Sequence, residues 1–180
     1  MTHEAGLEPT DTGTVPTEDG WFVLNARDAR WLHAPGRGAY SKLEGDLLFD
    51  QIGMHLCVLR PREPMAMYHW ELDQEDFLVV SGDALLVVEG AERVLRQWDF
   101  VHCASGTKHV IIGAGEAGCV LVAVGARDRG TEENWGGYTV DATAAKHGVS
   151  VERDTTKPEE AYSHLEQRQP TRYRDGWLPD

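Results

Sequence analysis

Four side chains in the middle of this 180-residue chain have the types and spacing of metal ligands: His69, Glu71, Glu75 and His109. On a strand, His69 and Glu71 would point to the same face, because side chains alternate along strands. Two imidazoles and two carboxylates directed into an apolar interior are costly to bury without partners, and a divalent cation can take all four as ligands. We therefore expect these four residues to hold one divalent metal ion.

The donor types narrow the choice of metal. Two imidazoles with two carboxylates form a harder set than three imidazoles, which favours Fe, Mn, Ni or Zn over Cu(I). Glu71 has three possible roles: it ligates the metal, it hydrogen-bonds a ligating histidine, or it transfers protons beside the metal as a catalytic acid or base. The sequence does not decide among these roles. It also leaves open the alternative that the protein binds no metal.

The segment that must position these side chains, residues 46–126, consists of short apolar runs separated by turn residues. Strands are predicted at 47–49, 54–59, 77–80, 84–88, 94–95, 100–103, 110–112 and 119–124. Runs at this spacing with glycine-containing turns are typical of an all-β sandwich or barrel, and a closed barrel leaves no open sheet edge. Residues 84–95, with Glu89-Gly90 at their centre, predict a hairpin.

In this setting the four residues resemble the two motifs of the cupin superfamily. The first motif, G-x5-H-x-H-x3–4-E-x6-G, is matched by His69-x-Glu71-x3-Glu75-x6-Gly82. The second, G-x5-P-x-G-x2-H-x3-N, is matched by Trp98-x5-Ala104-x-Gly106-x2-His109-x3-Gly113. The spacing agrees from His69 onward. Glu71 replaces the second His, Trp98 the first Gly of motif two, Ala104 the Pro and Gly113 the Asn.

The resemblance covers roughly residues 45–126 and is closest to small single-domain bacterial cupins that carry H-x-E. It implies a single double-stranded β-helix, or jelly-roll, barrel in which His69, Glu75 and His109 match three of the four metal ligands. It also implies a metal-dependent enzyme acting on a small molecule inside the barrel, by dioxygenase, decarboxylase or isomerase-type chemistry. The alternative is a non-catalytic module that binds a metal or small ligand, because a fold does not fix a function.

Three regions are expected along the chain. Residues 1–20 hold five acidic residues and no Lys or Arg, with little to bury, and are predicted to be a disordered acidic tail. Residues 21–130 form the barrel with an N-terminal strand arm. Residues 131–180 form an extension with short helices at 142–147 and 158–167, packed on the barrel or on a dimer partner. Tyr68 and Trp70 would point outward and need a cover, which residues 21–40, the C-terminal extension or a second subunit could supply. Cupins of this size commonly pair, which favours a homodimer.

Charge and composition exclude several classes of partner. The sequence has 17 Lys and Arg residues and 30 Asp and Glu residues, which gives a formal net charge of −13. This charge argues against binding to nucleic acid or to an anionic membrane. No apolar run approaches the roughly 18–20 residues of a membrane span, and the N-terminus lacks signal-peptide features. Three cysteines without C-x-x-C spacing argue against a disulfide framework, so a cytoplasmic location is expected.

Two further groups of residues are weaker candidates. His55 with Cys57, and His102 with Cys103, have no second ligand pair at a spacing that suits zinc. The cationic stretch 168–174 resembles an anion site, but its flanking acids favour packing against the chain itself or a dimer contact.

Overall fold

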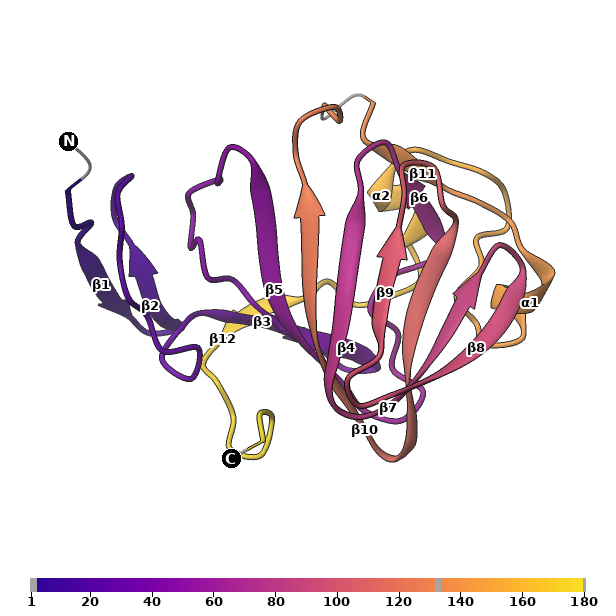
Figure 1. Cartoon of the computed structure of the whole chain (residues 1–180), viewed down its shortest axis with the longest axis horizontal. Coiled ribbons are helices and arrows are strands. Elements are labelled where there is room, and N and C mark those ends of the chain that lie inside the picture. The colour runs from indigo at the N-terminus through magenta and orange to yellow at the C-terminus, as the bar shows by residue number, and fades with distance from the viewer. Residues whose placement is uncertain (1–2, 132–133, 180) are drawn as a thin grey trace.

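The computed structural model describes residues 3–131 and 134–179, and within them the chain is almost entirely β-structure (Figure 1). The strands are β1 (Leu7–Thr10), β2 (Gly13–Pro16), β3 (Trp31–Ala34), β4 (Arg37–Ser41), β5 (Ile52–Leu59), β6 (His69–Glu71), β7 (Glu75–Val88), β8 (Ala91–Arg96), β9 (Phe100–Cys103), β10 (His109–Ala126), β11 (Gly136–Tyr138) and β12 (Gln169–Thr171). The helices are α1 (Ala142–Ala145) and α2 (Pro158–Ala161). Among the described residues, no helix is long and apolar enough to cross a membrane.

Two long strands, β7 and β10, form the spine of the barrel. They pair antiparallel from His109 opposite Val88 to Gly125 opposite Glu75, with register shifts near the middle. Strand β10 also pairs with β5 and β6, and β7 with β8 and β9, so the other barrel strands flank these two. The predicted hairpin over 84–95 is present as β7–β8, which turns at Glu89-Gly90.

The bend in the spine requires glycine at Gly82, the last residue of the first motif. Its φ of 74° is in the left-handed region, and a Cβ there would clash with the Gly118 carbonyl oxygen. Only glycine meets both conditions without strain. The glycine is therefore needed where the backbone of β7 lies close to the backbone of β10.

The barrel interior is filled by alternate side chains of these strands. Phe77, Val79, Leu86, Ile111 and Leu121 are all buried in one apolar cluster. Burying side chains of this size contributes about 1.5–3 kcal/mol each. The alternation that fills the core also directs the polar residues at the strand starts into the same interior.

The C-terminal extension covers the outside of the barrel. Strand β11 pairs with β6, and α1 is capped by Asp141, which accepts hydrogen bonds from the backbone of residues 143 and 144. Tyr68, expected to need a cover, is buried against a cluster that includes Ala144 and Val149 of the same chain. The cover of Tyr68 is therefore intramolecular, and the homodimer stays a prediction.

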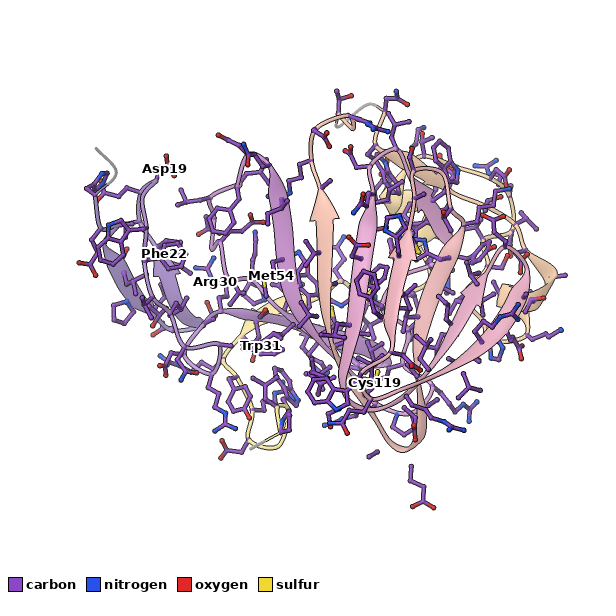
Figure 2. All side chains as sticks on the ribbon, viewed as in Figure 1. Asp19, Phe22, Arg30, Trp31, Met54 and Cys119 are labelled. Carbon is purple, nitrogen blue, oxygen red and sulfur yellow. The ribbon has the colours of Figure 1, made fainter. Side chains whose placement is uncertain are left out.

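The last part of the extension returns to the other end of the barrel. Strand β12 pairs with β3, and the Trp177 ring lies 5.1 Å from the ring of Trp31, which is labelled in Figure 2 beside the C-terminal loop. The one-turn helices α1 and α2 fall within the two predicted helical ranges but are shorter than either.

The prediction of a disordered tail over residues 1–20 is wrong for residues 3–20. They contain the antiparallel hairpin β1–β2, which lies at one end of the molecule (Figure 1). Backbone hydrogen bonds tie the hairpin to the segment that follows, Ala5 N to Trp21 O and Thr14 N to Asp28 O. Small buried side chains such as Ala5 complete the packing, which composition alone does not reveal. Residues 1 and 2 lie outside the described residues.

The predicted strand at 47–49 is also absent: residue 47 lies in a bend, and residues 48 and 49 have no regular secondary structure. Glu44 and Arg127 hold this loop. The Arg127 guanidinium donates to both Glu44 carboxylate oxygens at 2.8 Å and to the Phe49 carbonyl oxygen at 2.8 Å. Burial opposes ionisation of Glu44, whose side chain is 6% exposed, but hydrogen bonds from Arg127 and the Phe49 amide lower its pKa below the ordinary value.

This ion pair predicts a pH-dependent contribution to stability. A depressed carboxyl pKa stabilises the fold above the unfolded-state pKa of about 4.3, and the contribution is lost as the pH falls through the folded-state pKa. We expect Glu44→Gln to lower the free energy of unfolding by roughly 1–3 kcal/mol at pH 7 and by much less near pH 3. Urea unfolding at both pH values measures the difference.

Glu92→Gln is the matched control, because Glu92 pairs with His147 on the surface, and little change is expected there. A Glu44→Gln effect of equal size at both pH values would contradict the assignment.

Candidate metal centre

Three of the four predicted ligands meet at the beginnings of three neighbouring strands. His69 begins β6, Glu75 begins β7 and His109 begins β10. The ladder places His109 directly opposite His69, with ring centroids 4.8 Å apart. Glu75 Oε2 lies 3.2 Å from His109 Nε2 and 3.6 Å from His69 Nε2. One ligand atom from each residue falls within 4.8 Å of the other two.

Backbone carbonyls fix the orientation of both imidazoles. His69 Nδ1 lies 2.8 Å from the Met67 carbonyl oxygen, and His109 Nδ1 lies 3.0 Å from the Thr107 carbonyl oxygen. A carbonyl only accepts, so Nδ1–H is the donor in both contacts. The Nε2 lone pairs are therefore directed toward Glu75, the arrangement that a metal-ligating histidine requires.

The same atoms lack partners within the protein. His109 Nε2 and Glu75 Oε2 are buried and make no hydrogen bond to any described residue. Leaving such atoms unsatisfied costs about 1–3 kcal/mol each. Ligand atoms each about 2.0–2.2 Å from one ion would lie roughly 3.0–3.6 Å apart. Glu75 Oε2 lies 3.2 and 3.6 Å from the two histidine Nε2 atoms, and all three atoms fall within 4.8 Å. His69, Glu75 and His109 therefore fit a divalent cation.

Without a cation, a proton on His109 Nε2 would lie between His109 and Glu75 Oε2. Burial opposes the charged form of His109, but Cys103 and Glu75 outweigh burial and raise its pKa to about 10. Burial likewise opposes ionisation of Glu75, yet the adjacent His109 and His69 imidazoles lower its pKa to about 2. A metal ion would replace the proton on His109 Nε2.

Glu71 lies at the edge of this cluster. Its Oε1 is 3.8 Å from His69 Nε2, and its side chain is 30% exposed against 13% for Glu75. Burial, followed by the charge of Glu75, raises the pKa of Glu71 to about 7. Two neighbouring carboxyls with oppositely shifted pKa values are typical of acid and base pairs. The geometry separates Glu71 from the three converging side chains and leaves its role open.

The cluster opens onto a cavity of about 430 Å³, within the range of small-molecule sites. His69, Glu71 and Glu75 line it together with four aromatic side chains, Tyr40, Trp135, Tyr138 and Tyr162. The Trp135 and Tyr138 rings lie 6.3 and 6.1 Å from the His69 ring. All four aromatics come from outside the motif region, where no sequence pattern indicated them.

The weaker histidine and cysteine candidates do not join the cluster. His55 and Cys57 line the cavity, but burial raises the Cys57 pKa to about 12, which makes the thiol a poor ligand or nucleophile. His102 is half exposed and lies 2.7 Å from Asp76. Within the described residues, His69, Glu75 and His109 form the one group positioned to share a metal.

No family model matches the chain, and no curated protein sequence does, so the comparison rests on solved structures. An RmlC-like cupin from Shewanella frigidimarina is 14% identical, over 59% of this chain and 90% of that one, with a TM-score of 0.50. The polyketide cyclase RemF from Streptomyces resistomycificus is 16% identical, over 59% and 79%, with a TM-score of 0.50. The chain has the cupin fold.

A putative sugar phosphate isomerase from Acidithiobacillus ferrooxidans is also similar to this chain, at 26% identity and a TM-score of 0.41. The match covers 43% of this chain and spans about half of that protein, 51%. The two structures with a TM-score of 0.50 confirm the predicted all-β double-stranded β-helix.

Removal of either histidine should abolish metal binding by this protein. We expect His69→Ala and His109→Ala to lower bound metal from about one ion per chain to near zero, because each removes one of three converging donors. Elemental analysis of natively purified protein measures the content. His102→Ala is the control, since His102 lies on the surface beside Asp76. Unchanged stoichiometry in both cavity variants would rule out the site.

Proposed function

We propose that this cupin is a metal-dependent enzyme that acts on a small molecule in the barrel cavity. The observation that carries the proposal is that His69, Glu71 and Glu75 all line the cavity. Structural metal sites are closed by protein ligands, whereas catalytic sites keep a position open to substrate or water. Three protein donors beside a cavity of this volume favour an open site.

The metal ion, Glu71 and the aromatic side chains around the cavity have different roles in the proposed reaction. The ion, when bound, supplies a Lewis acid or an oxygen-activating centre. Glu71, beside His69 but more exposed than Glu75, is placed to hold or accept a proton at Oε1. The aromatic side chains from the extension cover the cavity, orient an apolar part of the substrate and exclude water.

The reaction class stays within dioxygenase, decarboxylase or isomerase-type chemistry. The two solved structures with a TM-score of 0.50 are 14% and 16% identical to this chain, a level that shows the fold and no more. Assays of oxygen consumption, carbon dioxide release and isomerisation on the protein loaded with its native metal would separate the three classes.

The role of Glu71 can be tested without knowing the substrate. In protein loaded with Mn²⁺, water-proton relaxation reports whether exchangeable water reaches the ion. We expect enhanced relaxation in the unaltered protein, and in Glu71→Gln the same relaxation with a metal affinity changed by less than about threefold, because a proton-transfer group is not a ligand. Turnover by Glu71→Gln should fall roughly 10²–10⁴-fold once the reaction is found.

Glu75→Gln is the matched comparison, because it alters a carboxylate that converges with both histidines, and it should release the metal. If Glu71→Gln instead weakens metal binding as much as Glu75→Gln does, Glu71 is a ligand. If the unaltered protein shows no relaxation enhancement, the site is closed and serves binding rather than catalysis.

A further inference from the structure

Two arginines beside the cavity, one buried and one half-buried, have no acidic partner among the described residues. Arg37 is 7% exposed, and Arg168 is half-buried and lines the cavity. Their hydrogen bonds go to backbone carbonyls: Arg37 Nη1 donates to Glu166 O at 3.1 Å, and Arg168 donates to Gly38 O and Met65 O. Among the described residues, neither forms an ion pair, in a chain with 30 acidic residues and only 17 Lys and Arg.

The guanidinium of Arg168 is held in place at the cavity wall. Nε donates to Gly38 O at 2.8 Å and Nη2 to Met65 O at 2.9 Å, while Cζ lies 5.1 Å from the centroid of the Tyr40 ring. Arg37 is fixed in a similar way, with Cζ 4.2 Å from the centroid of the Tyr162 ring. Both tyrosines line the same cavity. Carbonyls and ring faces orient these groups but do not neutralise them.

A buried cation without a counter-charge is destabilising, and a second cation nearby adds to the cost. Burial and then the charge of Arg37 lower the pKa of Arg168. Lys42 also lines the cavity, and the nearby Glu44 is already bound to Arg127. The acids that remain in the cavity, Glu71 and Glu75, lie beside the metal-ligating histidines. An incoming anion would therefore remove an electrostatic cost that the described residues leave uncompensated.

We propose that Arg168 binds an oxyanion group, a carboxylate or a phosphate, of the molecule that enters the cavity. A guanidinium with two of its nitrogens fixed by carbonyls presents its remaining N–H groups in one direction, which suits an oxyanion. That this molecule is a substrate rests on the proposed function; that the cavity selects anions does not. Arg168 precedes β12, so the C-terminal extension completes the site.

Three small probes of similar shape test the selection: benzoate, phenyl phosphate and the uncharged benzamide. Titration calorimetry on the natively purified protein should show at least one of the two anions binding about tenfold or more tightly than benzamide. The tighter of the two identifies the class of oxyanion. In Arg168→Gln we expect that preference to disappear while the benzamide affinity and the metal content stay the same.

Two further variants control for indirect effects. Arg172→Gln alters an exposed arginine of the same segment, outside the cavity, and should leave all three affinities unchanged. Arg168→Lys keeps the charge if Arg168→Gln does not fold, and it should weaken anion binding several-fold, because an ammonium lacks the planar fork of donors that reaches both carbonyls and the ligand.

Equal binding of benzamide and both anions, no binding of either anion at millimolar concentration, or unchanged anion affinity in the Arg168 variants would overturn the inference. With about one metal per chain still present, such a result leaves the proposed function standing. Absence of the metal, in contrast, contradicts the proposed function and not the anion site.

Discussion

The structure depends on one electrostatic constraint: polar atoms of His69, Glu75 and His109 converge in an apolar barrel, and Glu75 Oε2 and His109 Nε2 have no hydrogen-bond partner among the described residues. Backbone carbonyls accept hydrogen bonds from the Nδ1–H groups of both histidines. This leaves the Nε2 atoms of both directed at the Glu75 carboxylate. A cluster of this kind is costly to bury. A divalent cation would offset this cost by taking these atoms as ligands, and under the proposed function it would also be the reactive centre of the barrel.

The pairing register of the strands brings the three converging side chains together. Strand β6 is only three residues long, yet it pairs with β10 so that His69 lies opposite His109, and β11 pairs with its other edge. Gly82 allows β7 to approach β10 closely at Gly118, and Glu75 lies at the start of the same strand β7. The extension then closes the outer face around Tyr68 and supplies cavity walls from Trp135, Tyr138 and Tyr162.

Sequence reasoning reached the centre because its residues lie in one local pattern. Alternation on a strand and the spacing of two motifs were enough to predict that His69, Glu75 and His109 belong together, and the structure brings one ligand atom of each within 4.8 Å of the other two. The β7–β8 hairpin was predictable for the same reason, because Glu89-Gly90 interrupts alternating apolar residues.

What the sequence could not supply are contacts between distant segments. Residues 3–20 have a composition typical of disorder, but backbone hydrogen bonds to residues 21–28 order them. Arg168 is expected from its neighbours to pack against the chain, and it does, over Tyr40, yet nothing local shows that the same guanidinium lines a cavity. The distance of Glu71 from the converging atoms likewise depends on where β6 ends relative to β7.

The most direct test of the central claim is anomalous diffraction from crystals of the metal-loaded protein, collected at the absorption edge of the bound metal. The account predicts a single strong peak between Nε2 of His69, Nε2 of His109 and the Glu75 carboxylate, with Glu71 nearby but outside bonding distance. A peak coordinated by other residues, or no peak at these three, would contradict it.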